Sequence, residues 1–223
     1  MPKEQWTEVD SYITGLLARS DPALDGALER SAAAGLPAIH VSPNQGKLLQ
    51  LLAQGQKAAR ILEVGTLGAY STIWLARALP PGGRLITLEY EPKHAEVARA
   101  NVAAAGLKDV VEVRLGKGVD LLARLAAEGA GPFDFIFIDA DKQSYPEYFT
   151  WALKLSRKGT VIIADNVVRK GAVIEAGSSD PMVQGVRRMN ELVAREPRVS
   201  ATAVQTVGSK GYDGFMMALV TSD

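Results

Sequence analysis

Residues 59–223 alternate short apolar runs with longer segments of helical periodicity. This alternation is typical of a parallel β-sheet with helices packed on both faces. The apolar runs are nearly unbroken, as expected of strands that are buried on both sides. The pattern predicts five such strands, at residues 60–64, 84–89, 110–115, 133–138 and 160–164.

Helices are expected between these strands and after the last of them. Glycines stand where four of the helices should end, because glycine accepts the left-handed backbone of a helix cap. Pro181 suits the first turn of the last helix, with Ser179 or Asp180 as its cap. The expected helices are residues 71–79, 92–105, 118–127, 145–155 and 181–195.

The two ends of the chain follow other patterns. Residues 199–206 and 215–220 predict two strands that close the sheet as a hairpin, joined by a glycine-rich turn at residues 208–214. Residues 1–58 predict two or three helices, the last opened by Ser42 and Pro43. We interpret residues 1–223 as one α/β domain, in which residues 1–58 form a helical cap and residues 59–223 form the core.

Composition narrows the classes of function. A chain of 223 residues suffices for one α/β domain, and its formal charge of zero does not favour a nucleic-acid partner. No apolar run approaches the roughly 18 residues of a membrane span. Without cysteine there are no disulfides and no thiolate metal sites. We expect a cytoplasmic protein that binds neither nucleic acid nor membrane.

Acidic residues gather at the carboxyl ends of the predicted strands. In an open parallel sheet these ends meet at one edge, where ligands bind. Ionised side chains are costly to bury without partners, so their repeated appearance at one edge predicts a ligand site there. The four acids concerned, each on a different strand, are Glu63, Glu89, Asp139 and Asp165.

A glycine turn and the acid after it point to a nucleoside. Gly65 allows the backbone of the turn to approach a ligand closely, although the turn lacks the dinucleotide fingerprint Gly-x-Gly-x-x-Gly. Glu89 ends the second strand, where a carboxylate typically binds ribose hydroxyls. Glu63 beside the turn would tolerate a positively charged ligand better than a pyrophosphate, and a sulfonium nucleotide meets that condition.

A second cluster consists of oxygen donors. Asp139, Asp165 and Asn166 end neighbouring strands, and hard oxygen ligands favour Mg²⁺, Mn²⁺ or Ca²⁺ over zinc. Lys142 follows Asp139 by three residues and can reach the same place. The alternative is that Lys142 simply forms a salt bridge with an aspartate in a turn.

The motifs Ile-Asp-Ala-Asp-Lys at residues 138–142 and Ala-Asp-Asn at residues 164–166 resemble those of cation-dependent O-methyltransferases. This is the S-adenosylmethionine-dependent family of catechol and caffeoyl-CoA O-methyltransferases and their bacterial relatives, and the resemblance runs from about residue 36 to the carboxyl terminus. It implies a Rossmann-like, seven-stranded methyltransferase sheet with the last strand antiparallel, flanked by helices. It further implies S-adenosylmethionine and a divalent cation (Mg²⁺, or else Mn²⁺ or Ca²⁺) as cofactors, a phenolic, catechol-like vicinal diol as acceptor, and a homodimer.

The same resemblance assigns roles to individual residues. Asp139, Asp165 and Asn166 are expected to bind the metal, and Lys142, with Asp139 beside it, is expected to be catalytic. Substrate-side residues are Lys142, Tyr148 and Lys170. The expected cofactor-binding residues are Val41, Glu63, Gly65, Thr66, Ser71, Glu89, Gly118, Asp139 and Asp141.

Some features leave other functions open. A nicotinamide-dependent oxidoreductase would explain the sheet and Glu89, but not the Asp-Asn pair. A non-catalytic nucleoside-binding protein on the same scaffold is favoured only by Ala69, which stands where relatives carry glycine. We expect His94 to be solvated, leave open a role for His40 near the cofactor, and favour a turn-shaping role for Lys210, Tyr212 and Asp213.

Overall fold

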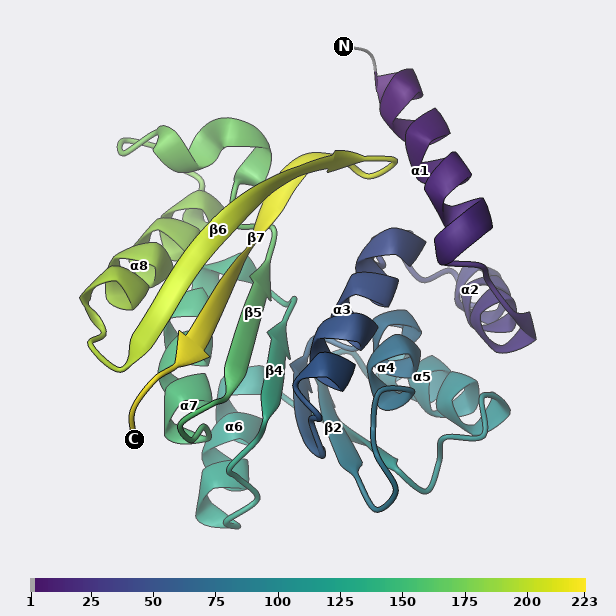
Figure 1. Ribbon diagram of the computed structural model, residues 1–223, viewed down its shortest axis with the longest axis horizontal. Helices are drawn as coiled ribbons and strands as arrows, with labels where there is room; N and C mark the ends of the chain where they lie inside the picture. The colour runs from purple at the N-terminus through teal and green to yellow at the C-terminus, as the bar shows by residue number, and fades with distance from the viewer. Residues whose placement is uncertain (1–2) are drawn as a thin grey trace.

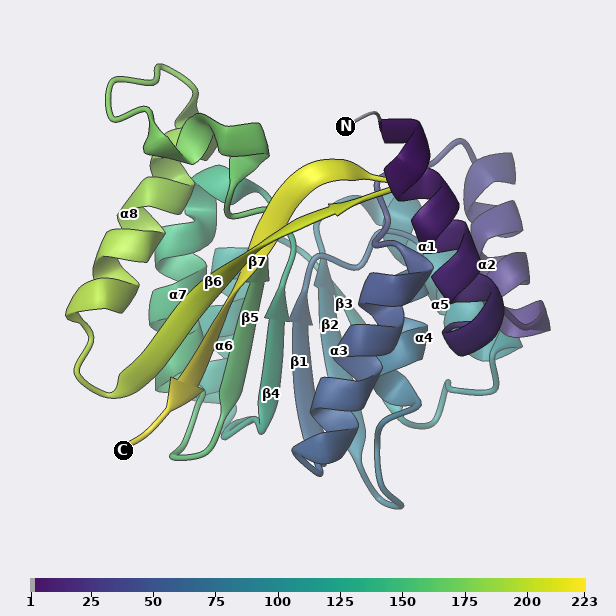
Figure 2. The ribbon, with the colours of Figure 1, turned by 45° about the horizontal axis from the view of Figure 1, so that its top comes forward.

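The computed structural model describes residues 3–223 (Figure 1). These residues include one seven-stranded sheet in the order β3-β2-β1-β4-β5-β7-β6, which can be followed in Figure 2. Strands β1 to β5 are parallel, and β7 runs antiparallel to both of its neighbours. This confirms the predicted Rossmann-like fold with the last strand antiparallel. The strands are β1 (Arg60–Val64), β2 (Arg84–Glu89), β3 (Val111–Leu115), β4 (Phe135–Ile138), β5 (Val161–Asp165), β6 (Val199–Gly208) and β7 (Gly211–Val220).

Helices cover the two faces of the sheet in two layers (Figure 2). Helices α6, α7 and α8 pack on one face and α3, α4 and α5 on the other, each layer with its own buried apolar cluster. The helices are α1 (Lys3–Leu17), α2 (Pro22–Ala33), α3 (Pro43–Gly55), α4 (Tyr70–Ala76), α5 (Pro92–Ala104), α6 (Gly118–Ala127), α7 (Tyr145–Lys154) and α8 (Pro181–Arg195), with the short 3₁₀ helices η1 (Lys142–Ser144) and η2 (Arg169–Ile174).

The central strand β4 illustrates how the apolar runs build this core. Successive side chains of a strand point to opposite faces. Phe135 and Phe137 therefore pack with the α3–α5 layer, whereas Ile136 and Ile138 pack with the α6–α8 layer, and all four are fully buried. Strand β4 has no polar position until it ends, which places Asp139 at the edge of the sheet.

The ends of the helices follow the predicted signals. Gly106 and Gly129 have φ values of 72° and 64°, the left-handed conformation expected where α5 and α6 stop. Ser42 caps α3 by accepting a hydrogen bond from the backbone N–H of Gln45 at 3.2 Å. Of the two caps considered for α8, Asp180 is the one that accepts from the backbone of Met182.

The closing hairpin corrects the predicted turn. Strands β6 and β7 stay paired up to Gly208 and Gly211, so the turn holds only Ser209 and Lys210 instead of residues 208–214. Tyr212 and Asp213 belong to β7, so the expectation that they shape the turn was wrong. The glycine content misled because Gly214 lies within the strand, where a Cβ would collide with the backbone of β6.

The helical segment before residue 59 consists of three helices. Helix α2 packs on α4 and α5, and α3 packs on α4, so both belong to the layer on that face of the sheet. Helix α1 lies outermost and reaches the tip of the hairpin, where Asp10 accepts a hydrogen bond from the backbone of Ser209 at 2.7 Å (Figure 2). Among residues 3–223, no helix has both the length and the apolar character that crossing a membrane requires.

Candidate active site

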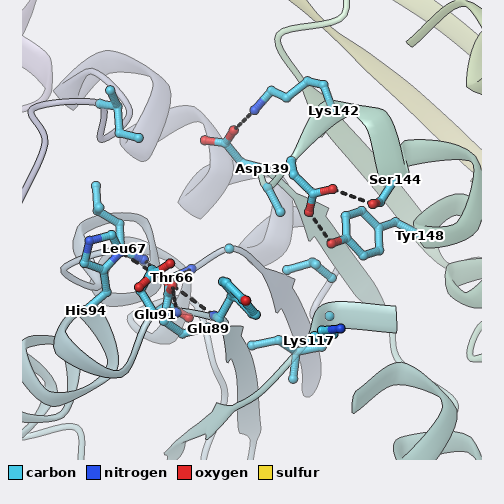
Figure 3. Close-up of a pocket in the computed structure, with 18 of the residues that line it drawn as sticks. Thr66, Leu67, Glu89, Glu91, His94, Lys117, Asp139, Lys142, Ser144 and Tyr148 are labelled. Carbon is cyan, nitrogen blue, oxygen red and sulfur yellow. Dashed lines mark hydrogen bonds and ion pairs between the residues drawn. The ribbon is translucent and has the colours of Figure 1, made fainter. Parts of the chain in front are cut away.

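A cavity of about 930 Å³ opens at the carboxyl ends of the parallel strands (Figure 3). Its walls come from the loops after β1 to β5, from residues 39–41 before α3, and from the start of α8. Glu63, Asp165 and Lys170 do not reach its surface. The predicted site residues that line it are Val41, Gly65, Thr66, Ser71, Glu89, Gly118, Asp139, Asp141, Lys142, Tyr148 and Asn166.

Glu63 lies beneath the cavity and is fully buried. Its carboxylate accepts hydrogen bonds from the hydroxyls of Ser71 at 2.6 Å and Thr87 at 2.7 Å, and from that of Thr72. Burial raises the pKa of Glu63 to about 7, although these hydrogen bonds act in the opposite direction. Glu63 therefore meets the cavity only through Ser71, which forms part of the wall.

Glu89 joins two loops at the cavity wall (Figure 3). One carboxylate oxygen accepts from the backbone N–H groups of Thr66 and Leu67, at 3.2 and 2.7 Å. The other accepts from Tyr90 and Glu91, both at 2.9 Å. Because a carboxylate offers about four lone-pair sites, the protein already occupies the acceptor capacity of Glu89. A ribose at this position would share the carboxylate with these backbone donors.

The glycine turn is pressed against the neighbouring strand. Gly65 has a φ of 100°, and a Cβ there would overlap the backbone carbonyl of Asp139. The turn can lie this close to the end of β4 only because residue 65 has no side chain. Ala69 also adopts a left-handed conformation, with φ of 63°, but its methyl group is fully buried and does not line the cavity.

Asp139, Asp165 and Asn166 lie at the ends of two paired strands, because Ile138 of β4 is in register with Ala164 of β5. Asp139 and Asn166 line the cavity, while Asp165 is 6% exposed behind them. Burial, together with the charge of Asp139, raises the pKa of Asp165 well above its usual range. The two carboxylates therefore repel each other at this edge.

Lys142 pairs with the nearer of these acids. Its Nζ donates a hydrogen bond to Asp139 Oδ1 at 2.6 Å, and the lysine is only 9% exposed (Figure 3). The salt bridge considered from the sequence is thus present. One ammonium does not neutralise two carboxylates, so the pair leaves negative charge at the strand ends.

The donor set fits a hard divalent cation. It offers only oxygen atoms, two of them from the carboxylates of half-buried Asp139 and buried Asp165, whose repulsion a cation would relieve. No group of three or more histidine, cysteine, aspartate or glutamate side chains within residues 3–223 could hold a metal. The amide oxygen of Asn166 must therefore be the third protein ligand if a cation binds here.

Two residues outside the motifs support this corner. The hydroxyl of Tyr145, which is fully buried, lies 2.8 Å from the carbonyl oxygen of Asp165 and 3.3 Å from that of Ile138, so it bridges the two strand ends. Its ring lies 5.4 Å from Lys142 Nζ. Gly185 of α8 touches η1 so closely that a Cβ would overlap the carbonyl oxygen of Lys142. Helix α8 thus fixes the backbone that carries the lysine.

Tyr148 lies among residues predicted to bind the cofactor. Its hydroxyl donates to the carboxylate of Asp141, as does that of Ser144 (Figure 3). Its ring packs on Gly118, where a Cβ would stand 2.9 Å from ring atoms. The substrate-side role of Tyr148 stays a prediction, while its contacts are with Asp141 and Gly118.

Some cavity residues were not found from the sequence. His94, expected to be solvated, lines the wall with Nδ1 3.5 Å from Glu89 Oε1, because it stands in the first turn of the helix that follows β2. His40, for which the sequence left open a role near the cofactor, lines the wall near Tyr70. Arg169 faces the cavity, whereas Lys170 next to it is exposed and lies outside the wall. For His94 and Arg169, the position shortly after a strand end was the available signal.

The sheet order, the antiparallel last strand and the cavity at the strand ends define the Rossmann-like methyltransferase class. The family model described as O-methyltransferase matches residues 18–219. The chain belongs to this family, and it is an S-adenosylmethionine-dependent O-methyltransferase, as the motifs predicted.

Individual relatives are similar over their whole length. A protein of Niastella koreensis named catechol O-methyltransferase is 57% identical over 220 residues, which are 99% of this chain and 100% of that protein. The crystal structure of the O-methyltransferase from Bacillus cereus in complex with SAH is 62% identical, with a TM-score of 0.97 and coverage of 99% and 100%. The O-methyltransferase TomG from Streptomyces achromogenes, solved with SAM, is 52% identical, with a TM-score of 0.96 over both full chains.

Proposed function

We propose that this enzyme methylates one hydroxyl of a catechol-like vicinal diol, with a divalent cation held by Asp139, Asp165 and Asn166. The observation that carries the proposal is the convergence of these oxygen donors beside Lys142 at the wall of the cavity. The name of the Niastella koreensis relative supports the acceptor class. None of the relatives described above has a name that indicates a nicotinamide-dependent oxidoreductase.

S-adenosylmethionine would be held in the part of the cavity formed by residues 39–41 before α3 and by the loops after β1, β2, β3 and β4. Val41, Gly65, Thr66 and Ser71 bind it from one side, and Glu63 positions Ser71 from below. The structures of relatives with SAH and SAM support this ligand. On the other side the cofactor meets Glu89, Gly118, Asp139 and Asp141.

When bound, S-adenosylmethionine supplies an electrophilic methyl group, and a divalent cation supplies the charge that lowers the pKa of a diol hydroxyl. Lys142 Nζ first loses its own proton to solvent and then, as a neutral amine, accepts the proton of the attacking hydroxyl, because it is the basic group beside the donor set. Asp139 fixes the direction of that amine through their 2.6 Å hydrogen bond. The walls hold acceptor and donor in line, an effect that can contribute roughly 7–11 kcal/mol.

The protein is also proposed to act as a homodimer. Val204 and Leu219 are 47% and 38% exposed on the sheet face that α3, α4 and α5 leave open over β6 and β7 (Figure 2). Exposed apolar side chains on one sheet face are a common feature of subunit interfaces. Light scattering after size-exclusion chromatography should give twice the mass of the chain. The cytoplasmic location stays a prediction.

The test of the proposed function is methyl transfer from labelled S-adenosylmethionine to 3,4-dihydroxybenzoate and to 3,4-dihydroxybenzamide. EDTA should abolish transfer, and Mg²⁺ or Mn²⁺ should restore it. Calorimetry should show binding of S-adenosylhomocysteine and none of NAD. Full activity in chelator would show that the Asp-Asn cluster is only structural, and binding of NAD alone would favour the oxidoreductase.

A further inference from the structure

The loop after β5 has an unusual backbone, which directs the side chain of one basic residue, Arg169, towards the cavity. Asn166, Arg169 and Lys170 have φ values of 56°, 54° and 56°, the left-handed region that side chains rarely adopt. Asp213 of β7 holds the loop in this shape, since its Oδ1 accepts from the backbone N–H groups of Val168 and Arg169, both at 3.0 Å. As a result Arg169 lines the cavity and Lys170 faces solvent.

The guanidinium of Arg169 lacks a partner for its charge. Within residues 3–223, Arg169 makes no ion pair, and its buried Nε has no hydrogen-bond acceptor. Its hydrogen-bond contact is a weak one, from Nη2 to the sulfur of Met182 at 3.8 Å. A guanidinium is always charged, and buried donors are rarely left without an acceptor. The position therefore suits an anion that enters from the cavity.

The neighbours of Arg169 indicate which ligand brings this anion. Asn166, three residues earlier, is one of the proposed metal ligands, and Met182 lies at the start of α8 on the same wall. The residues proposed for the cofactor come from other loops, after β1, β2, β3 and β4 and before α3. The other cation of this corner, Lys142, is already paired with Asp139. Arg169 is thus a positive charge without an ion-pair partner beside the proposed acceptor site.

We propose that Arg169 binds a carboxylate on the acceptor, so that the enzyme selects acidic catechols over neutral ones. This inference rests on the proposed function and names the substrate class of the same site. A planar guanidinium binds a carboxylate through two parallel hydrogen bonds, which a neutral group of the same shape cannot reproduce. Charge-assisted hydrogen bonds of this kind correspond to roughly tenfold or more in binding.

The test compares two acceptors of equal shape, 3,4-dihydroxybenzoate and its neutral amide, 3,4-dihydroxybenzamide. The wild-type enzyme, with Mg²⁺ and saturating S-adenosylmethionine, should show a kcat/KM about tenfold higher for the acid. In Arg169→Gln this preference should disappear, through a loss for the acid and with activity on the amide within about twofold. Retained activity on the amide also shows that the variant is folded.

Two further variants separate this contact from a general effect of charge. Arg188→Gln removes an exposed arginine of α8 that lies outside the cavity and should keep the preference for the acid. Lys170→Gln removes the neighbouring cation and should keep it as well. If the preference survives in Arg169→Gln, or is lost in Lys170→Gln instead, the assignment is wrong.

The cofactor is the other possible source of a carboxylate, because its methionine portion carries one. Calorimetry with S-adenosylhomocysteine should give the same affinity for Arg169→Gln and wild type, within about twofold. A tenfold loss of that affinity, with the acid preference intact, would place the guanidinium on the cofactor and overturn the proposal. Methylation of both diols without any preference would overturn it too, yet leave the proposed function standing. Methylation of neither diol would contradict the proposed function itself.

Discussion

The two halves of the cavity treat their charged groups differently. At the ends of β1 and β2, protein donors satisfy the acids: Glu63 accepts from three hydroxyls and Glu89 from four backbone N–H groups. At the ends of β4 and β5, the charges of Asp139 and Asp165 repel each other, and the Nε of Arg169 has no acceptor. The first half is complete as the chain folds, whereas the second, on the function proposed above, is completed by what it binds.

This contrast has a physical basis. A wall whose buried charges have all their hydrogen bonds formed is rigid. A ligand can bind to such a wall without first rearranging the protein, which favours its affinity. Unsatisfied charges cost stability, and that cost is recovered only when a ligand of opposite charge arrives. We therefore expect changes to Lys142, Asp165 and Asn166 to affect turnover, and changes to Glu63 and Glu89 to affect stability and cofactor binding.

The largest effect is expected from Lys142→Ala. Loss of a general base should lower kcat by about 10²-fold or more. Affinity for S-adenosylhomocysteine should stay within about twofold of wild type, because Lys142 is not among the residues proposed to bind the cofactor. Lys142→Arg should be similarly inactive, since a guanidinium keeps the charge but cannot accept a proton. Unchanged turnover in either variant would remove Lys142 as the base.

Glu63→Gln should change how stability depends on pH. The pKa of Glu63 rises from 4.5 to about 7 through burial, so the folded chain keeps a proton that the unfolded chain releases. The free energy of unfolding should therefore fall as pH rises from about 4 to about 8, by roughly 3 kcal/mol in total. The pKa of Asp165 is also raised, so the pH dependence must be compared between wild type and Glu63→Gln.

Urea unfolding at pH 5.5 and pH 8 measures this difference. Wild type should lose more stability over that interval than Glu63→Gln, which carries no titrating group at the position. Equal losses in the two proteins would mean that the buried carboxylate stays ionised throughout, held by its three hydroxyl donors.

Gly185→Ala should lower kcat about tenfold. The added methyl group overlaps the carbonyl of Lys142, so η1 must move, and small displacements at a catalytic group are costly. Affinity for S-adenosylhomocysteine should stay within about twofold, because the added methyl group meets Lys142 and Gln143 and none of the residues proposed to bind the cofactor. Gly15→Ala in α1 is the matched control, since a Cβ there meets open space. A folded Gly185→Ala enzyme with normal kcat would show that α8 does not position the lysine.

The smallest effect is expected from Tyr148→Phe. Removal of the hydroxyl leaves Asp141 with one hydroxyl donor in place of two and should weaken S-adenosylhomocysteine binding about threefold. The KM for the acceptor should not change. The reverse result, a higher KM for the acceptor with cofactor affinity intact, would restore the substrate-side role that the resemblance implies for Tyr148.

The strand ends were predictable from the sequence, whereas the loops beyond them were not. Unbroken apolar runs fix where β4 and β5 end, so Asp139 and Asp165 had to lie at one edge. That Arg169 turns inward while Lys170 turns outward depends on left-handed backbone angles imposed by Asp213 from a distant strand. No local pattern reports such a contact.

Glycines show the same limit. Gly65 could be interpreted from its position in a turn, but Gly185 stands in a helix, where the sequence offers no reason for it. Its reason is the backbone of Lys142, which packs against it from another element. Gly214 was placed in a turn because glycine is common there, although close approach to β6 explains it. Packing between distant segments is the part that sequence patterns leave out.

The most direct measurement uses calorimetry to detect binding of Mn²⁺ to the enzyme saturated with S-adenosylhomocysteine. We expect one site in the wild-type protein, lost in Asp165→Ala and in Asn166→Ala, while both variants keep S-adenosylhomocysteine. A wild-type protein that binds no cation, or variants that bind it equally well, would show that the half of the cavity at β4 and β5 is not completed by a metal.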